Sequence, residues 1–125
     1  MMRSRIITGL LLVISVIHLL PVIGFFGVEQ LASLYGISIM DSNLEIVMRH
    51  RAILFGILGI FFAYAAFRPA AQPLAFVFAF ISLASFFYLA FSIGEFNDSI
   101  RKVVIADVVA SVCLFGAIAL YVIKE

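Results

Sequence analysis

The stretch that decides the fold reads PLAFVFAFISLASFFYLAFSI over residues 73–93, and no charged side chain interrupts it. A helix needs about 20 apolar residues to cross the roughly 30 Å hydrocarbon core of a bilayer. Three further stretches of comparable length lie at about residues 6–26, 44–67 and 100–123. Hydrophobic residues make up 66% of the 125-residue chain and charged residues only 12%, against about a quarter charged in an ordinary soluble domain. The chain therefore folds in lipid.

The backbone of these spans restricts the fold class. In hydrocarbon every N–H and C=O group must be hydrogen-bonded within the protein, which only helices and closed barrels achieve. The alternating pattern of a barrel strand is absent. We therefore expect an all-α integral membrane protein, a four-transmembrane-helix bundle that forms one domain over residues 1–125.

The connections between the spans differ in length. Residues 68–72 and 94–99 form short turns, whereas the connection over residues 27–43 is much longer. Within the long connection, the apolar residues of 28–35 follow helical spacing. The sequence therefore predicts a short interfacial helix between the first and second spans.

Polar and flexible residues mark the ends of the predicted helices. Gly36 offers a natural stop for the short helix. Asp41 or Ser42 is expected to cap the second span, since Ser42 and Glu45 have the spacing of a capping box. Asn97, Asp98 and Ser99 are candidate caps for the fourth span.

An even number of spans places both termini on the same side of the membrane. Basic residues are equally frequent on the two sides, so their count does not set the orientation. Arg3 and Arg5, however, precede the first span, which usually dominates. We therefore expect both termini to be cytoplasmic.

Polar residues inside the spans carry most of the functional information. Counted at about 1.5 Å per helical residue, one residue of each span falls in a common layer in the non-cytoplasmic half of the membrane: His18, Arg51, Tyr88 and Asp107. Four polar groups at one depth predict a shared pocket.

Asp107 is the most informative of these residues, because a carboxylate inside a span is costly unless it is paired or neutralised. Arg49 or Arg51 is the expected partner. Arg49 lies nearer the small-residue face of its helix, so we expect Arg49 in the bundle interior and Arg51 extended to the lipid head groups. The sequence leaves open whether the pair joins two helices, belongs to a binding or catalytic site, or lies in the interface.

His18 lies just before Pro21, which removes a helical hydrogen bond and frees the carbonyl of Ile17. The histidine is expected either to bond such a loosened backbone group or to act as a proton donor and acceptor or an axial ligand. His50 is the only other histidine, and neither Cys113 nor a second carboxylate lies at ligand spacing. No metal site is predicted.

The second span also carries a stripe of small residues at helical spacing: Ala52, Gly56, Gly59, Ala63 and Ala66. Small residues let transmembrane helices approach one another closely. We expect another helix of the same chain in this groove, with a homodimer contact as the alternative.

Four short segments of the chain can be compared with those of known membrane proteins: LYG at residues 34–36, MRHRAILFG at 48–56, HLLP at 18–21 and VIAD at 104–107. Together they resemble small bacterial four-helix membrane proteins of the DoxX-like type. The resemblance implies the same fold and a location in the bacterial inner membrane. It implies no particular reaction.

Motifs of soluble enzyme chemistry are absent from the chain. It has no Gly-rich phosphate loop, nucleotide fingerprint, nucleophile elbow or paired CxxC, and no basic block indicates nucleic acid. The sequence does not identify a cofactor. Membrane lipid is the expected environment and the expected source of a ligand.

We therefore expect a non-enzymatic protein that binds an amphipathic lipid or a quinone-like molecule in an intramembrane polar pocket. The candidate ligand-binding residues are His18, Arg49, Arg51, Tyr88 and Asp107. The first alternative is a membrane enzyme, an isomerase or oxidoreductase of a lipid-soluble substrate, in which His18 or Asp107 transfers a proton. The second is an assembly or interaction subunit that uses the small-residue stripe.

Overall fold

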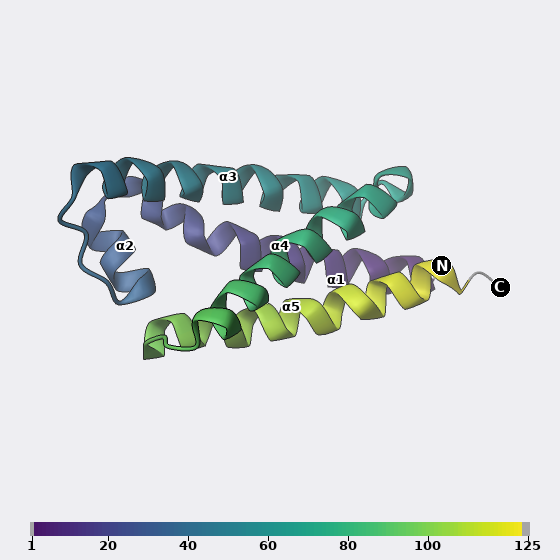
Figure 1. Ribbon diagram of the computed structural model, residues 1–125. Helices are drawn as coiled ribbons and strands as arrows, with labels where there is room; N and C mark the ends of the chain where they lie inside the picture. The colour runs from purple at the N-terminus through teal and green to yellow at the C-terminus, as the bar shows by residue number, and fades with distance from the viewer. Residues whose placement is uncertain (1, 124–125) are drawn as a thin grey trace.

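A computed structural model describes residues 2–123 of the chain. Within this range there are four long helical segments, and the long connection between the first two contains one short helix (Figure 1). The elements, in chain order, are α1 Met2–Leu19, η1 Leu20–Phe26, α2 Val28–Tyr35, α3 Ser42–Ala66, η2 Pro69–Ala71, α4 Gln72–Ile93 and α5 Asp98–Val122, where η denotes a 3-10 helix. The predicted all-α fold is confirmed.

The exposed surface of the helices indicates whether the protein folds in water or in lipid. Each of the four long segments is long and apolar enough to cross a membrane, and only 22–28% of the most apolar part of each is buried inside the protein. Large exposed apolar surfaces are rare in water-soluble monomers, whereas lipid chains cover them at no cost. The chain is an integral membrane protein.

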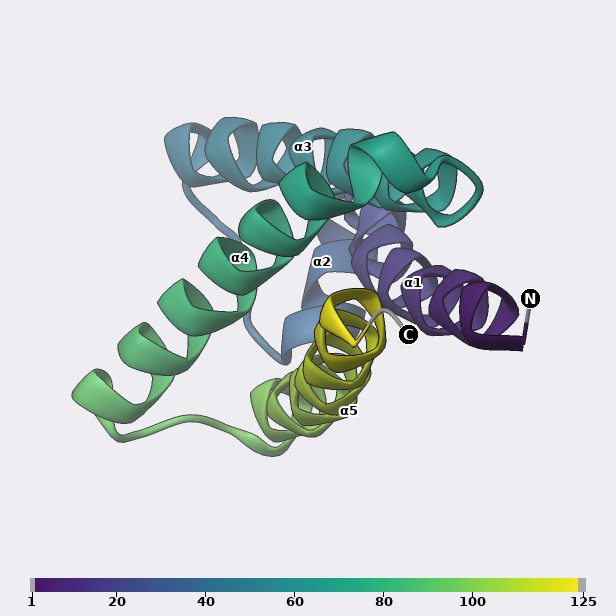
Figure 2. The ribbon, with the colours of Figure 1, turned by 90° about the vertical axis from the view of Figure 1, so that its right-hand side faces the viewer.

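The helices form a bundle in which one helix is inclined to the others (Figure 1). α1, α3 and α5 run along the long axis of the molecule, and α4 crosses it obliquely (Figure 1). α4 starts beside the end of α3 and then diverges from it (Figure 2). Both termini lie at one end, where the guanidinium of Arg3 donates a hydrogen bond to the carbonyl of Ile123. α2 lies at the opposite end.

The closest helix packing is between α3 and the first span. A Cβ atom added at Gly59 would lie 2.7 Å from Cδ2 of Leu19, and one added at Gly56 would lie 3.1 Å from Cγ2 of Val22. The hydroxyl of Ser15 donates a 2.7 Å hydrogen bond to the Gly59 carbonyl. In the stripe, Ala63 is half-buried and the other members are buried: Ala52, Gly56, Gly59 and Ala66. The groove of α3 is thus occupied by α1 and η1 of the same chain.

Two more side-chain hydrogen bonds join helices near the terminal end. Thr8 Oγ1 donates to the carbonyl of Ala66 at 2.7 Å, and Gln72 Nε2 donates to that of Ala65 at 3.0 Å. Polar bonds of this kind link helices in the absence of a hydrophobic driving force between them. They hold α1 and α4 to α3 at this end.

The short helix α2 has the predicted bounds and the predicted stop. Gly36 follows it with φ 67°, in the left-handed region that favours glycine. Leu31 and Tyr35 are buried, and they pack with Ile39 against residues that include Val103 of α5. α2 therefore covers the end of the bundle with its apolar face.

The caps of α3 and α5 come from asparagine and aspartate. The amide of Asn43 donates to Asp41 Oδ1 at 2.9 Å, so Asp41 is the cap of α3. The capping box expected between Ser42 and Glu45 does not form, because the Glu45 carboxylate pairs with an arginine one turn later. Asn97 caps α5, its Oδ1 accepting from the amide of Ile100 at 2.8 Å.

Candidate functional site

A cavity of about 510 Å³ lies inside the bundle at the α2 end. Its walls come from η1 and the end of α1, from α2, from α3, from the second half of α4 and from the first half of α5. The polar residues that line it are His18, Ser33, Tyr35, Arg51, Ser82, Ser85, Ser99, Lys102 and Asp107. The remaining walls are apolar: Ile17, Leu20, Pro21, Leu34, Phe55, Phe86, Leu89, Val103 and Ala106. A volume of this size is typical of a small-molecule site.

The cavity exists because α4 diverges from α3. The two helices are neighbours near their connection, where the rings of Phe61 and Phe78 lie 5.7 Å apart. Further along, α4 crosses toward α5 (Figures 1 and 2). The space that opens between α3, α4 and α5 is covered at the end by α2, and Leu20 and Leu89 on its rim are more than half exposed. The cavity is therefore open to the surface of the spans.

His18 joins two walls of the cavity and is 97% buried, with a relative exposure of 3%. Its Nδ1 lies 3.0 Å from the carbonyl of Ile14, and its Nε2 lies 2.9 Å from Oγ of Ser82 on α4. A carbonyl can only accept, so Nδ1 carries a proton and donates. In the neutral ring Nε2 then accepts from the Ser82 hydroxyl. The bonded carbonyl is that of Ile14, one turn back, and not the Ile17 carbonyl freed by Pro21.

Arg51 is the main cation of the cavity. Its NH1 group donates a 2.8 Å hydrogen bond to the hydroxyl of Tyr35. The guanidinium carbon lies 4.6 Å from the centre of the Phe55 ring and 5.4 Å from that of Tyr35. Two aromatic rings thus hold a half-buried guanidinium through cation–π contacts.

Asp107 lines the cavity from α5, opposite the arginine of α3. Among residues 2–123 its carboxylate has no ion pair or hydrogen bond, and only its backbone carbonyl is bonded, by Ser111 Oγ at 2.8 Å. No ion pair joins it to Arg51 within 4.0 Å in that range. The two opposite charges face one space without contacting each other.

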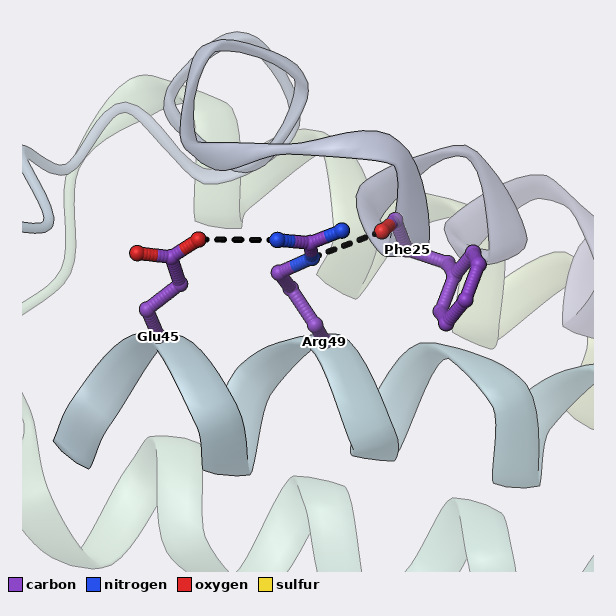
Figure 3. A network of polar contacts seen from close by, with 3 residues as sticks. All are labelled: Phe25, Glu45 and Arg49. Carbon is purple, nitrogen blue, oxygen red and sulfur yellow. Dashed lines mark hydrogen bonds and ion pairs between the residues drawn. The ribbon is translucent and has the colours of Figure 1, made fainter. Parts of the chain in front are cut away.

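The expectation that Arg49 lies in the interior beside Asp107 is wrong. Arg49 lies outside the cavity, where its Nε donates to the carbonyl of Phe25 at 2.8 Å and its NH1 pairs with Glu45 at 2.9 Å (Figure 3). Its guanidinium also lies 5.6 Å from the centre of the Phe25 ring. Arg49 thus binds the end of η1.

The physical reason is the facing of α3. Residues two positions apart point in nearly opposite directions on a helix. Arg49 does follow the small-residue stripe, as expected, but that stripe faces α1 and η1. Arg51 shares the next face with Phe55 and Phe62, whose rings lie 5.9 and 4.9 Å from that of His18. The cavity lies on this second face, so Arg51 and not Arg49 reaches it.

Tyr88 also lies outside the cavity, contrary to the expected placement. Its side chain is 71% exposed, and the face of α4 that lines the cavity carries Ser82, Ser85, Phe86 and Leu89 instead. The depth that Tyr88 shares with His18, Arg51 and Asp107 does not bring it into the cavity, because the oblique course of α4 turns its side chain outward. Of the five candidate residues, His18, Arg51 and Asp107 share the cavity, and Arg49 and Tyr88 do not.

Polar lining residues that were not predicted as part of the site also contribute to the cavity: Ser33, Tyr35, Ser82, Ser85, Ser99 and Lys102. Ser82 lies one turn before Ser85, and Lys102 lies just over one turn before Asp107. The first spacing places Ser82 near the face of Ser85, whereas five residues turn Lys102 about 140° away from Asp107, so the pattern of α5 does not predict Lys102. Tyr35 carried no signal beyond its apolar position in α2, since its hydroxyl finds Arg51 only through the tertiary fold.

Comparison of this chain with protein-family models, with curated proteins and with solved structures found no match. Within residues 2–123, no cluster of three or more histidine, cysteine, aspartate or glutamate side chains could hold a metal ion. The site is thus characterised by its own geometry: two facing opposite charges, a buried histidine, several hydroxyls and apolar walls.

Proposed function

We propose that this membrane protein binds an amphipathic lipid or a quinone-like molecule in the cavity at the α2 end. The observation that carries the proposal is that Arg51 and Asp107 line one cavity from different helices without an ion pair between them. Charges at membrane depth usually pair with each other or mark the path of a ligand. A head group that contacts both would satisfy them.

The rest of the cavity wall fits such a molecule. Hydroxyls of Ser82 and Ser85 stand beside the apolar side chains of Phe86 and Leu89 on the same helix. Polar groups that fix orientation within a mainly apolar wall are characteristic of ligand sites. The exposed rim residues provide a route for a tail toward the surrounding lipid.

The experiment is extraction of bound amphiphiles from protein purified in mild detergent, followed by mass spectrometry. We expect a stoichiometric amphiphile in the wild type and its loss in Arg51→Gln and Asp107→Asn. Arg49→Gln is the matched control, because it removes an arginine of the same helix outside the cavity. A wild type that neither retains an amphiphile nor binds an added one would contradict the proposal.

A catalytic role is the second candidate, favoured by the placement of His18 and Asp107 on the same cavity. His18 has its Nε2 against a hydroxyl of the wall, where a proton can be exchanged. Chemical conversion of an added quinone or sterol, abolished in His18→Gln, would establish an isomerase or oxidoreductase. Recovery of an unchanged amphiphile favours binding alone.

The third candidate function is that of an assembly subunit, and it was suggested by the small-residue stripe of α3. The small-residue stripe packs against Leu19 and Val22 within the chain and is not an open surface. Membership of the DoxX-like type and a location in the bacterial inner membrane remain proposals that rest on the short segments quoted above. The cytoplasmic placement of both termini is likewise a proposal, supported by Arg3 and Arg5 ahead of the first span.

A further inference from the structure

The charged groups on the cavity wall select among the amphiphiles that could bind there. Arg51 and Lys102 are cations, and Asp107 is the one carboxylate among the lining residues. His18 donates from Nδ1 to a backbone carbonyl and contacts Ser82 with Nε2, which the neutral ring satisfies. Two cations and one anion leave the wall with one net positive charge.

Arg51 has the geometry of an acid-binding group. One of its nitrogens is used by Tyr35, and within residues 2–123 its other nitrogens make no hydrogen bond. The rings of Phe55 and Tyr35 hold the guanidinium in place. A planar guanidinium with free donors binds a carboxylate or a phosphate through two parallel bonds, and fixing it in advance lowers the entropic cost.

We propose, on the basis of the function proposed above, that the bound amphiphile carries an acidic head group with one negative charge, a phosphodiester or a carboxylate. The acidic group binds Arg51 and Lys102, while Asp107 accepts a hydrogen bond from a hydroxyl of the same head group and repels a second negative charge. A neutral quinone would leave the positive charge of the wall unbalanced. A doubly charged phosphomonoester would meet repulsion from Asp107.

The test is native mass spectrometry of the protein in neutral detergent with added phosphatidylglycerol, phosphatidylcholine, ubiquinone or phosphatidic acid. The expected order places singly charged phosphatidylglycerol first. Arg51→Gln and Lys102→Gln should each weaken its binding by about tenfold or more, since a charged hydrogen bond is lost. Asp107→Asn should raise the relative binding of doubly charged phosphatidic acid.

The matched controls lie outside the cavity. Arg49→Gln and Arg101→Gln each remove one positive charge close to the residue tested. Arg101 pairs with Asp98 and lies over the ring of Phe96, outside the cavity. We expect both to bind phosphatidylglycerol as the wild type does. Lys102 is exposed, so Lys102→Gln serves as the test if Arg51→Gln fails to fold.

The outcomes separate the two proposals. Tighter binding of ubiquinone or phosphatidylcholine than of phosphatidylglycerol, still lost in Arg51→Gln, overturns the acidic class and keeps the proposed function. An equal loss of phosphatidylglycerol binding in the control variants shows general attraction of lipid to surface charge. That result overturns the assignment of an acidic head group to the cavity. Inorganic phosphate that displaces the lipid fully shows a free-anion site and overturns it too. Saturable binding of none of the four lipids contradicts both proposals.

Discussion

Nε2 of His18 and Oγ of Ser82 lie 2.9 Å apart and join α1 to the half of α4 that diverges from α3. Within residues 2–123, the other side-chain hydrogen bond between α4 and a neighbouring helix is that of Gln72 to α3, and it lies near the terminal end. The histidine–serine contact is therefore a fixed point between the helices at the cavity.

Ser82→Ala should destabilise the protein by about 1–3 kcal/mol, the usual cost of leaving a buried group without its partner. The measurement is thermal unfolding in detergent. Ser85→Ala is the control, since its hydroxyl bonds the carbonyl of Ser82 in its own helix and has no hydrogen bond to another helix within residues 2–123. We expect almost no change. Equal effects of the two substitutions would show that the link between helices contributes nothing.

Gly59→Ala should cost about 1–3 kcal/mol, because the added methyl group overpacks the contact between α1 and α3. The new Cβ would lie 2.7 Å from Leu19 and 3.1 Å from the backbone carbonyl of Ser15, which cannot move freely. Gly9→Ala is the control, since nothing lies within 4 Å of its Cβ position. Unfolding midpoints in the same detergent provide the comparison, and an unchanged midpoint for Gly59→Ala would mean that the helices can separate without loss.

Arg49→Gln should lower stability by about 1 kcal/mol, a value reduced by the partial exposure of the Arg49–Glu45 pair. The loss should be local, because Arg49 holds the Phe25 carbonyl at the end of η1. Hydrogen exchange is expected to speed up in η1 and to stay unchanged in α5. Faster exchange throughout the protein would instead indicate global unfolding and contradict the local role.

The orientation can be tested with single cysteines in a Cys113→Ser background. Ser4→Cys lies at the terminal end and Glu29→Cys lies on α2, and both positions are exposed. We expect a membrane-impermeant maleimide to label Glu29→Cys in intact bacterial cells and Ser4→Cys only after lysis. The reverse pattern would place the termini outside the cytoplasm.

The helices could be predicted because each one is determined by the sequence of its own span. The apolar stretches indicated the long helices, and the spacing over residues 28–35 together with Gly36 gave α2 its bounds. Each of these signals is local. Which of the two arginines, Arg49 or Arg51, reaches the cavity is not determined by the local sequence. It depends on the face of α3 that the oblique α4 leaves uncovered, and no pattern within α3 encodes the course of α4.

Tyr88 illustrates the same limit in another way. Counting residues from the membrane boundary gives depth but not direction, and four residues at one depth can point to four different surroundings. His18 was placed correctly because its helix is surrounded by α3 and α5 and because its ring packs against Phe62. The direction of the side chain was therefore predicted correctly for His18 on α1, and wrongly for Arg49 on α3 and Tyr88 on α4.

The side chain of Asn97 performs two tasks at once. Its Nδ2 donates to the carbonyls of Tyr35 and Gly36 at the end of α2, at 2.9 and 3.2 Å, while its Oδ1 caps the first turn of α5. Lifting α2 away from the bundle would therefore break bonds that orient the amide capping α5. A molecule that leaves the cavity by this end must disrupt an amide that does not itself line the cavity.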